Sequence, residues 1–511
     1  MNADQTTGVP EPAITVSEAP AWDLAQRVAS RAREGMRFAG LLGPGRSPGP
    51  DGSRAGKIYA ILCGRGRPSS IHVLSSYVPS SVSSDRSAAG GQVLSVPSLT
   101  RLAPAADWYE RKMHDMYGII PVGHPHLRPL ISQGSGPTTS HVLGEGMFTM
   151  PYGPVRSGVF EAVEYMIETP GEEIPHLEVR PHPKHRGIEE RFDQLDIETG
   201  ALLAERIEGV ASVAHAIAFC QAVERICDAS IPRRAALWRV LHAELERIAN
   251  HLDVAVRLTE AAGLAVANAR FGIGKEHAQR LRADLCGSRF GRGVVAPGGV
   301  AAPAASTLGD AHAALHDLEK AVMSDTEAAL QTPSFVDRLR GAGLIDEKTA
   351  RDHGAVGPLA RASGIVEDTR TDRPYAAYAE LEPQAPATRS AGDALARLEV
   401  RQEELHASFK MACKAISELV AAGDAAGMRD QSSRVTTIDV RDGENIGWSE
   451  GPHGEILSLV SVRGGRLEST LSRPASFHNL ALLPRAFQGD ILTDFAFIEA
   501  SFGLSIAGAA L

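Results

Sequence analysis

The sequence predicts an α+β protein, with a small N-terminal α+β domain followed by a helix-bundle core with flanking β elements. Short apolar runs of strand composition occur early, at residues 57–63 and 71–78. Residues 232–262 instead space their apolar side chains at i, i+4 and i+7, as in a helix with one buried face. A chain of 511 residues is too long for one ordinary domain, so two or three are expected.

Composition excludes several classes of function. The formal net charge is -10, from 62 acidic and 52 basic residues, which argues against a general nucleic-acid-binding protein. The five cysteines form no C-x-x-C pair, and their odd number argues against a disulfide framework. Residues 1–20 lack an apolar signal segment, and the most apolar stretch, residues 209–223, is shorter than the roughly 20 residues that a bilayer requires. The composition therefore predicts a soluble, intracellular protein that can still dock on a membrane protein.

The first part of the chain divides into a tail and a domain. Residues 1–20 are acidic and Pro-rich and are predicted to be a disordered tail. Residues 21–130 are predicted to form the first domain, and Gly118 is placed to cap its last helix. The expected elements are a helix at residues 21–38, strands at 57–63, 71–78 and 92–96, and a helix at 108–118.

The second part of the chain begins after a predicted linker. Residues 131–145 are rich in serine, glycine and threonine, so the second domain is expected to span residues 146–511. It opens on a predicted hairpin that turns at Gly153-Pro154. The expected elements are strands at 148–153 and 159–168, helices at 232–262, 270–290, 310–330 and 391–422, and strands and turns from 438 to 511.

Residues 185–215 mix acidic and basic side chains with a run that is apolar enough to be buried. Buried charges are costly unless they are paired, so this mixture predicts either a functional site or a paired structural network. The residue types alone favour the network. No phosphate-binding loop, dinucleotide fingerprint or nucleophile triad can be argued from spacing. The residues by themselves therefore indicate a two-domain protein with a polar site near a helix bundle.

A family resemblance extends this interpretation over nearly the whole chain past residue 20. The pattern E-R-x-x-x-D-M-Y-G-I at residues 110–119, followed by G-H-P-x-L-R at 123–128, resembles the 30-kDa-type subunit of respiratory complex I. Residues 146–511 resemble the 49-kDa-type subunit. They are more similar still to the large subunit of formate-hydrogenlyase-type (group 4) [NiFe] hydrogenases, in which the two units are also fused. The motifs are Gly153-Pro154-Val155, His185-Arg186-Gly187-Ile188-Glu189, Glu205-Arg206 with Gly209 and His215, E-x-x-R-x-x-x-H-L at 244–252, G-P and R-A-S-G within 357–364, and D-x-R at 368–370.

The chain departs from the hydrogenase pattern at the metal. The resemblance implies nickel and iron held by four thiolates in two C-x-x-C pairs, which soft metals require. The first pair falls at Glu208 and Ala211 and the second at Ser501 and Leu504, and no cysteine follows Cys413. We therefore expect no metal ligands at these former ligand positions, no nickel–iron centre and no hydrogenase activity of the chain itself.

The complex I resemblance implies a quinone cavity, with a histidine in the first hairpin turn and a tyrosine in the cavity wall. The turn here has no histidine but offers Arg156, which could anchor a carbonyl oxygen but not protonate it. Glu208 replaces the first lost thiolate and could relay protons, with His215 as a second step, and Arg206 beside them is the third predicted catalytic residue. Alternatively, Glu208 and Arg206 neutralise each other in a collapsed metal cavity, and the sequence leaves both interpretations open.

Two further groups of motif residues have expected roles. By resemblance, His185, Arg186 and Glu189 lie near the iron–sulfur small subunit, beside a quinone or the nearest cluster. For the long helix at residues 232–262, we expect a salt-bridge ladder rather than a site, formed by Glu244, Arg247 and His251.

The resemblance implies an electron-transfer subunit of a membrane-associated oxidoreductase complex related to NADH-quinone oxidoreductase and formate hydrogenlyase. It would handle a quinone or similar carrier and bind no cofactor alone, with a 4Fe-4S cluster in the small subunit. Ferredoxin-like and antiporter-like membrane subunits are the other expected partners, which place it in the cytoplasm, peripheral on the inner face of the cell membrane. The alternative is a structural or coupling subunit that kept the scaffold and lost the redox chemistry.

Overall fold

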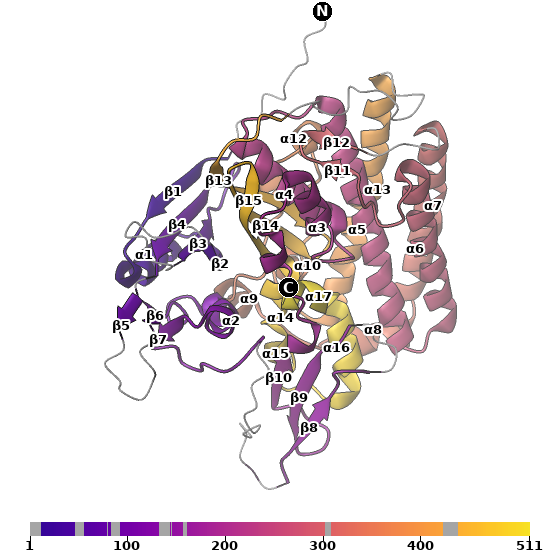
Figure 1. The fold of residues 1–511 in the computed structure, drawn as a ribbon. Helices are drawn as coiled ribbons and strands as arrows, with labels where there is room; N and C mark the ends of the chain where they lie inside the picture. The colour runs from indigo at the N-terminus through magenta and orange to yellow at the C-terminus, as the bar shows by residue number, and fades with distance from the viewer. Residues whose placement is uncertain are drawn as a thin grey trace, which may run out of the picture.

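A computed structural model gives the fold of the chain. Figure 1 shows the N-terminal sheets on one side of a bundle of long helices, with the C-terminal segments lying between them. No helix among the described residues is both long and apolar enough to cross a membrane. The described residues are 12–45, 56–78, 80–82, 92–131, 144, 146–156, 161–301, 308–422 and 438–511.

A four-stranded sheet forms the first layer of the N-terminal domain. Its strand order is β1-β4-β3-β2, with β1 parallel to β4 and the other pairs antiparallel. The helix α1 packs against β4 and β3. The elements are β1 (Ile14–Glu18), α1 (Ala21–Arg33), β2 (Arg37–Gly45), β3 (Lys57–Cys63) and β4 (Ile71–Tyr77).

This sheet corrects two expectations. The predicted tail is wrong at its end, because residues 14–18 form β1, in register with β4 through the pair Ile14 and Ile71. The predicted helix at residues 21–38 ends at Arg33, because Gly35 (φ 91°) reverses the chain into β2. Residues 1–11 and nearly all of the predicted linker lie outside the described residues.

The rest of the N-terminal domain carries the predicted strand at residues 92–96 and the predicted helix at 108–118. That helix, α2 (Asp107–Tyr117), ends as expected at Gly118, which has φ 67°. The Trp108 and Tyr109 rings meet Phe477 edge-on, with centroids 5.8 and 4.9 Å apart, and so join this domain to the core. The strands are β5 (Ser80–Val82), β6 (Gln92–Pro97) and β7 (Ile120–Val122).

The second domain opens on the predicted hairpin. Its strands β8 (Phe148–Tyr152) and β9 (Glu164–Thr169) are antiparallel, and β10 (His176–Arg180) pairs with β9 to complete a three-stranded sheet. Short helical segments then lead to α4 (Ser212–Ile226), which is buried along nearly its whole length. These segments are η2 (His182–Lys184), η3 (Glu189–Phe192) and α3 (Ile197–Ala204).

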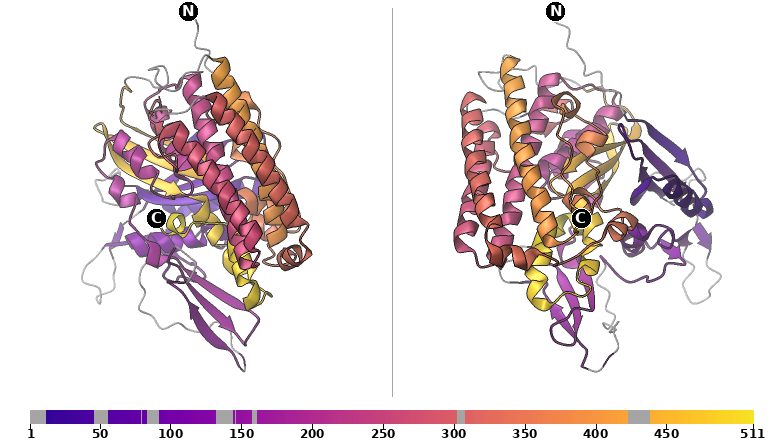
Figure 2. Two further views of the ribbon diagram at one scale, coloured as in Figure 1. Left: turned by 90° about the vertical axis from the view of Figure 1, so that its right-hand side faces the viewer. Right: turned by 180° about the vertical axis from the view of Figure 1, so that it is seen from behind.

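Four long helices make the bundle, all close to their predicted ranges. They are α5 (Arg233–Ala261), α6 (Ala265–Cys286), α7 (Leu308–Leu330) and α13 (Ala394–Ala421). The helix α5 is central, because it packs on both α6 and α13, as the two further views in Figure 2 also show. Shorter elements around the bundle are β11 (Val295–Ala296), β12 (Gly299–Val300), α8 (Pro333–Leu339), α9 (Glu347–Asp352), α10 (Gly357–Ala362), α11 (Thr369–Asp372) and α12 (Tyr378–Leu381).

The C-terminal segment is only half as predicted. Three antiparallel strands form a sheet, β13 (Gly443–Gly451), β14 (Gly454–Arg463) and β15 (Arg466–Arg473), and β13 and β14 pack on α4. The expectation of strands and turns up to residue 511 is wrong, because the segment after β15 is helical. These helices have eight residues or fewer, so tertiary packing rather than a periodic pattern stabilises them. They are α14 (Ala475–Leu480), α15 (Leu483–Ala486), η5 (Leu492–Asp494), α16 (Phe495–Phe502) and α17 (Ile506–Ala510).

Candidate functional site

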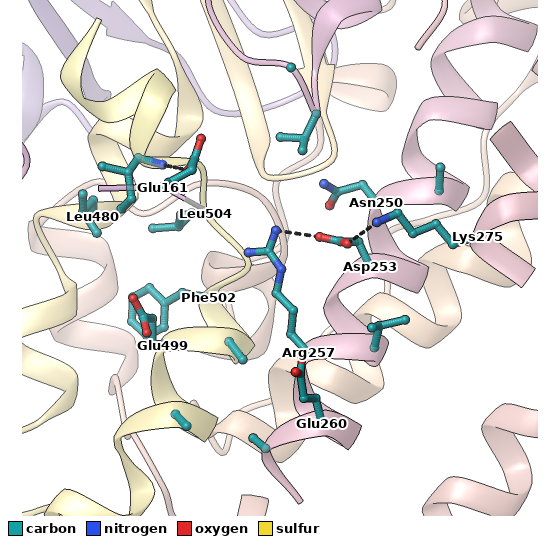
Figure 3. Close-up of a pocket in the computed structure, with 18 of the residues that line it drawn as sticks. Glu161, Asn250, Asp253, Arg257, Glu260, Lys275, Leu480, Glu499, Phe502 and Leu504 are labelled. Atoms are coloured by element: carbon teal, nitrogen blue, oxygen red, sulfur yellow. Dashed lines mark hydrogen bonds and ion pairs between the residues drawn. The ribbon is translucent and has the colours of Figure 1, made fainter. Parts of the chain in front are cut away.

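A cavity of about 540 Å³ lies between α5, α6, the hairpin β8–β9 and the C-terminal helices. Figure 3 shows Asn250, Asp253 and Lys275 on one side of it and Phe502 and Leu504 on the other. Its size and mixed lining suit a small amphipathic molecule. We call one set of lining residues the polar wall; it consists of Glu246, Asn250, Asp253, Arg257, Lys275 and Arg282. The facing set, the apolar wall, consists of Leu480, Phe495, Phe502, Leu504 and Ile506.

Ion pairs fix the outer part of the polar wall, whose residues lie on one face of α5 and on α6. Asp253 accepts a hydrogen bond from Lys275 Nζ at 2.5 Å and lies 2.7 Å from Arg257 Nη2, so these three groups hold one another (Figure 3). At the other end of the same α5 face, the Glu246 carboxylate accepts hydrogen bonds from the backbone N–H groups of Val213 and Ala214, at 2.8 and 3.1 Å, where α4 begins. Burial raises the pKa of Glu246 to about 7, so this carboxyl can exchange a proton near neutral pH.

Glu208 and His215, the expected proton relay, lie together. His215 Nε2 and Glu208 Oε2 are 3.3 Å apart, and both side chains are buried. The alternative in which Arg206 neutralises Glu208 is wrong, because the Arg206 side chain is exposed. The buried His215 contacts the Glu208 carboxylate instead. Glu208 stands behind the cavity surface, which Gly209 and Val210 line instead. Proton transfer along this pair stays a prediction.

The four former ligand positions do not fit a nickel–iron centre. The side chains of Ala211 and Leu504 have no donor atom. The Ser501 hydroxyl accepts a hydrogen bond from Arg397 Nε at 2.9 Å and donates one to the Ile498 carbonyl at 2.7 Å. One carboxylate and one engaged hydroxyl cannot replace four thiolates. Among the described residues, no group of three or more histidine, cysteine, aspartate or glutamate side chains could hold a metal ion.

The last helix closes over Glu208, and this contact can be tested at Gly508. A Cβ atom at Gly508 would collide with the Glu208 carboxylate. We expect Gly508→Ala to displace Glu208 from His215 and to destabilise the protein by about 1–3 kcal/mol, as overpacking does. The thermal unfolding midpoint measures this change. Gly272→Ala is the matched control, because a Cβ there meets nothing within 4 Å and alanine favours the α6 helix. Equal midpoints for the two variants would contradict the packing described.

Arg156, the expected quinone anchor, lines the cavity but already has a partner. Its guanidinium donates to both carboxylate oxygens of Glu499, at 2.9 and 2.7 Å. Tyr165 donates its hydroxyl to the same carboxylate at 2.7 Å, and the guanidinium carbon lies 5.0 Å from the ring centroids of Tyr152 and Tyr165. A ligand that recruits Arg156 must therefore compete with a bidentate ion pair.

The His185–Glu189 motif holds the end of the chain. His185 Nδ1 lies 2.7 Å from the Ala510 carbonyl oxygen, and Arg186 donates to the Ala507 carbonyl at 3.0 Å. Glu189 accepts Lys112 Nζ at 2.6 Å and so joins the two domains. Each of these groups has a structural contact, and the implied role beside a partner's cluster stays a prediction.

Buried ionic clusters lie in the described part of the core, and the predicted ladder adjoins one of them through Glu404. The Glu244–Arg247 pair is confirmed at 3.3 Å, but His251 pairs across to Glu404 on α13, at 3.0 Å. In one cluster, which we call the three-acid cluster, Arg361 pairs with Asp368, Glu404 and Glu450. In another, which we call the three-arginine cluster, Glu455 pairs with Arg37, Arg373 and Arg473.

Sequence reasoning missed the inner end of the polar wall. Glu246 and Asn250 continue with Asp253 and Arg257 at spacings of four, three and four residues, so a polar stripe on α5 could have been recognised. Arg282 lies one helix later and no sequence signal joins it to that stripe. Only the packing of α6 on α5 brings it to the cavity.

Comparison with known proteins gives a consistent family. Residues 271–509 match the family "Respiratory-chain NADH dehydrogenase, 49 Kd subunit", and residues 66–138 match the 30 Kd subunit family. Formate hydrogenlyase subunit 5 of Escherichia coli is 27% identical over 79% of this chain and 75% of that protein. An NADH-quinone oxidoreductase subunit of Akkermansia muciniphila is 28% identical over 71% of this chain and 92% of that protein. In structure, a chain of the archaeal membrane-bound sulfane sulfur reductase matches with a TM-score of 0.66 and 22% identity, over 73% of this chain and 100% of that one.

Proposed function

This chain fuses the 30-kDa and 49-kDa domains of respiratory complex I, and from that premise we propose that it handles a quinone or similar carrier in its cavity. It is a subunit of a complex I-like or group 4 hydrogenase-like membrane complex. In the proposal, electrons come from a 4Fe-4S cluster in an iron–sulfur small subunit. Ferredoxin-like and antiporter-like subunits complete the complex at the inner face of the cell membrane.

One observation carries the proposal: the cavity has a polar and an apolar wall, and it lies beside the loop at residues 208–211. A quinone presents carbonyl oxygens at one end and an apolar tail at the other. The polar wall can therefore bind the carbonyl oxygens, and the apolar wall can pack against the tail. Behind the loop, Glu208 and His215 form the proposed route for protons to the carrier. Arg156 and the His185–Glu189 motif are proposed to orient the carrier and the nearest cluster of the partner.

A binding experiment tests this function. We expect decylubiquinone to bind the chain reconstituted with its iron–sulfur small subunit. Filling the apolar side of the cavity with Ala500→Phe should weaken binding at least about tenfold, about 1.4 kcal/mol. Arg156→Ala and Glu208→Ala should weaken it as well. Val420→Phe, at an exposed position of α13 outside the cavity, is the control that should bind like wild type.

The contacts of the predicted redox residues favour a second candidate, a scaffold or coupling subunit. Arg156 is held by Glu499, and Glu208 lies against His215, so both groups have internal partners. The same experiment decides between the two. If wild-type protein binds no decylubiquinone while the assembly stays intact in all variants, the coupling role stands and the carrier role fails.

A further inference from the structure

Arg282 is the least satisfied charged group of the polar wall. Its side chain is only 4% exposed, yet its Nε and Nη2 atoms have no hydrogen-bond partner within the described part of the chain. The nearest carboxylate, that of Glu246, lies 3.6 Å from Nη2, beyond hydrogen-bond distance. Buried donors without acceptors are costly, so a guanidinium in this position needs an explanation.

The loop after α6 backs this guanidinium. Gly291 has φ 64°, and a Cβ atom there would meet Arg282 Nη2 and Val213. The loop can therefore lie against Arg282 only because residue 291 is a glycine. The loop fills the space on that side of the guanidinium, and Arg282 also lines the cavity. The protein covers the unsatisfied Nε and Nη2 atoms, so an acceptor oxygen in the cavity reaches them once the Arg282 side chain turns toward it.

Glu246 is the group that competes for Arg282. It faces Arg282 from α6, Arg247 from its own helix and the first N–H groups of α4. Burial outweighs these favourable charges and raises the pKa of Glu246 to about 7. Its carboxyl is therefore about half ionised at neutral pH, and only the ionised form attracts the guanidinium strongly.

We propose that Arg282 anchors the oxygen-bearing head group of the cavity ligand and that the protonation of Glu246 controls this anchor. When Glu246 is neutral, Arg282 donates its free N–H groups to a ring oxygen of the ligand. When Glu246 is ionised, its carboxylate draws Arg282 back. The inference rests on the proposed carrier function and names the head-group site that this function requires, at Arg282 rather than at Arg156.

The proposal fixes the sign of a pH dependence. Below pH 7 Glu246 is neutral and affinity is high, whereas above pH 7 the ionised carboxylate competes and affinity falls. We expect the Kd for decylubiquinone, which does not ionise in this range, to rise about tenfold between pH 6 and pH 8.5. Isothermal titration calorimetry of the chain with its small subunit measures this change.

Variants separate the two groups. Glu246→Gln should bind decylubiquinone with the same affinity at pH 6 and pH 8.5, near the wild-type affinity at pH 6. Arg282→Met should bind it at least tenfold more weakly than wild type at both pH values. Arg282→Lys retains the charge and should recover part of the binding. Glu276→Gln and Arg280→Met, at a half-buried and an exposed position of α6 outside the cavity lining, are the matched controls and should keep the wild-type pH dependence of binding.

Three results would overturn the inference: a flat wild-type profile, a wild-type profile in Glu246→Gln, or unchanged binding by folded Arg282→Met. Each of them leaves the carrier function standing, since wild type still binds. Absence of wild-type binding at both pH values would instead overturn the carrier function, and the head-group anchor with it.

Discussion

Arg361→Met is expected to destabilise the core by at least about 3–5 kcal/mol, because it removes the cation of the three-acid cluster. Arg361 is 0% exposed and lies 2.7 Å from Glu404, 3.1 Å from Glu450 and 3.4 Å from Asp368. Methionine fills a similar volume but leaves three buried carboxylates with too little positive charge. The midpoint of urea unfolding measures the loss.

The pH dependence of this variant distinguishes lost charge from lost packing. Burial raises the pKa of Asp368 and Glu404, but the guanidinium of Arg361 and, at Asp368, that of Arg370 hold both below their ordinary values. In wild type these groups therefore add stability above about pH 4, which is lost as pH falls through their lowered pKa values. Without Arg361 the Glu404 carboxyl prefers to be neutral, whereas Arg370 still holds Asp368, so the cost of an ionised Glu404 applies above about pH 4 and shrinks on acidification. The difference in urea unfolding midpoint between Arg361→Met and wild type should therefore be smaller at pH 5 than at pH 8.

Arg389→Met is the matched control for this prediction. Arg389 also pairs with two carboxylates, Glu399 and Glu403, but its side chain is 35% exposed. Its loss should cost less than about 1 kcal/mol and show little pH dependence. Equal midpoints for the two variants would show that the three-acid cluster does not depend on Arg361.

Local sequence patterns were enough to find the long elements of this fold. Strands β3 and β4 follow their apolar runs, and α2 ends at Gly118 because only a residue tolerant of positive φ suits that cap. Strand β1 could not be found this way. It exists through parallel pairing of Ile14 with Ile71, and a pairing so distant in sequence leaves no local signal.

The candidate site was predictable only in part. The motifs pointed to the right region, because Gly209 and Arg156 line the cavity and Glu208 lies behind it. They did not predict that Glu499 would hold Arg156 or that Glu246 and Arg282 would form the inner end of the polar wall. Such contacts depend on how the helices α5, α6 and α16 pack, which spacing along one chain does not encode.

Glu455→Gln is expected to destabilise the protein about as much as Arg361→Met does. Here the imbalance is an excess of positive charge, because the substitution removes the carboxylate of the three-arginine cluster. The Glu455 carboxylate accepts Arg37 at 2.8 Å and also forms short ion pairs with Arg373 and Arg473. Glutamine has nearly the same shape but no charge, so three buried arginines repel one another. Because Arg37 belongs to β2 and Glu455 to β14, the change should cost at least about 3–5 kcal/mol and loosen the N-terminal sheet from the core.

Urea unfolding and limited proteolysis check this expectation, with cleavage between the two domains as the sign of loosening. Glu444→Gln is the matched control. Glu444 also joins the core to the sheet, through Tyr59 and Lys57 of β3, but its side chain is 25% exposed and its loss should cost about 1 kcal/mol or less.

A second substitution tests the physical cause. Burial lowers the pKa of Arg473 to about 10, so the buried site disfavours the charge of this arginine. Adding Arg473→Met to Glu455→Gln removes one of the three repelling charges and should restore part of the lost stability, although Arg473→Met alone destabilises the protein. If the two losses simply add, then charge repulsion among the arginines is not what Glu455 prevents.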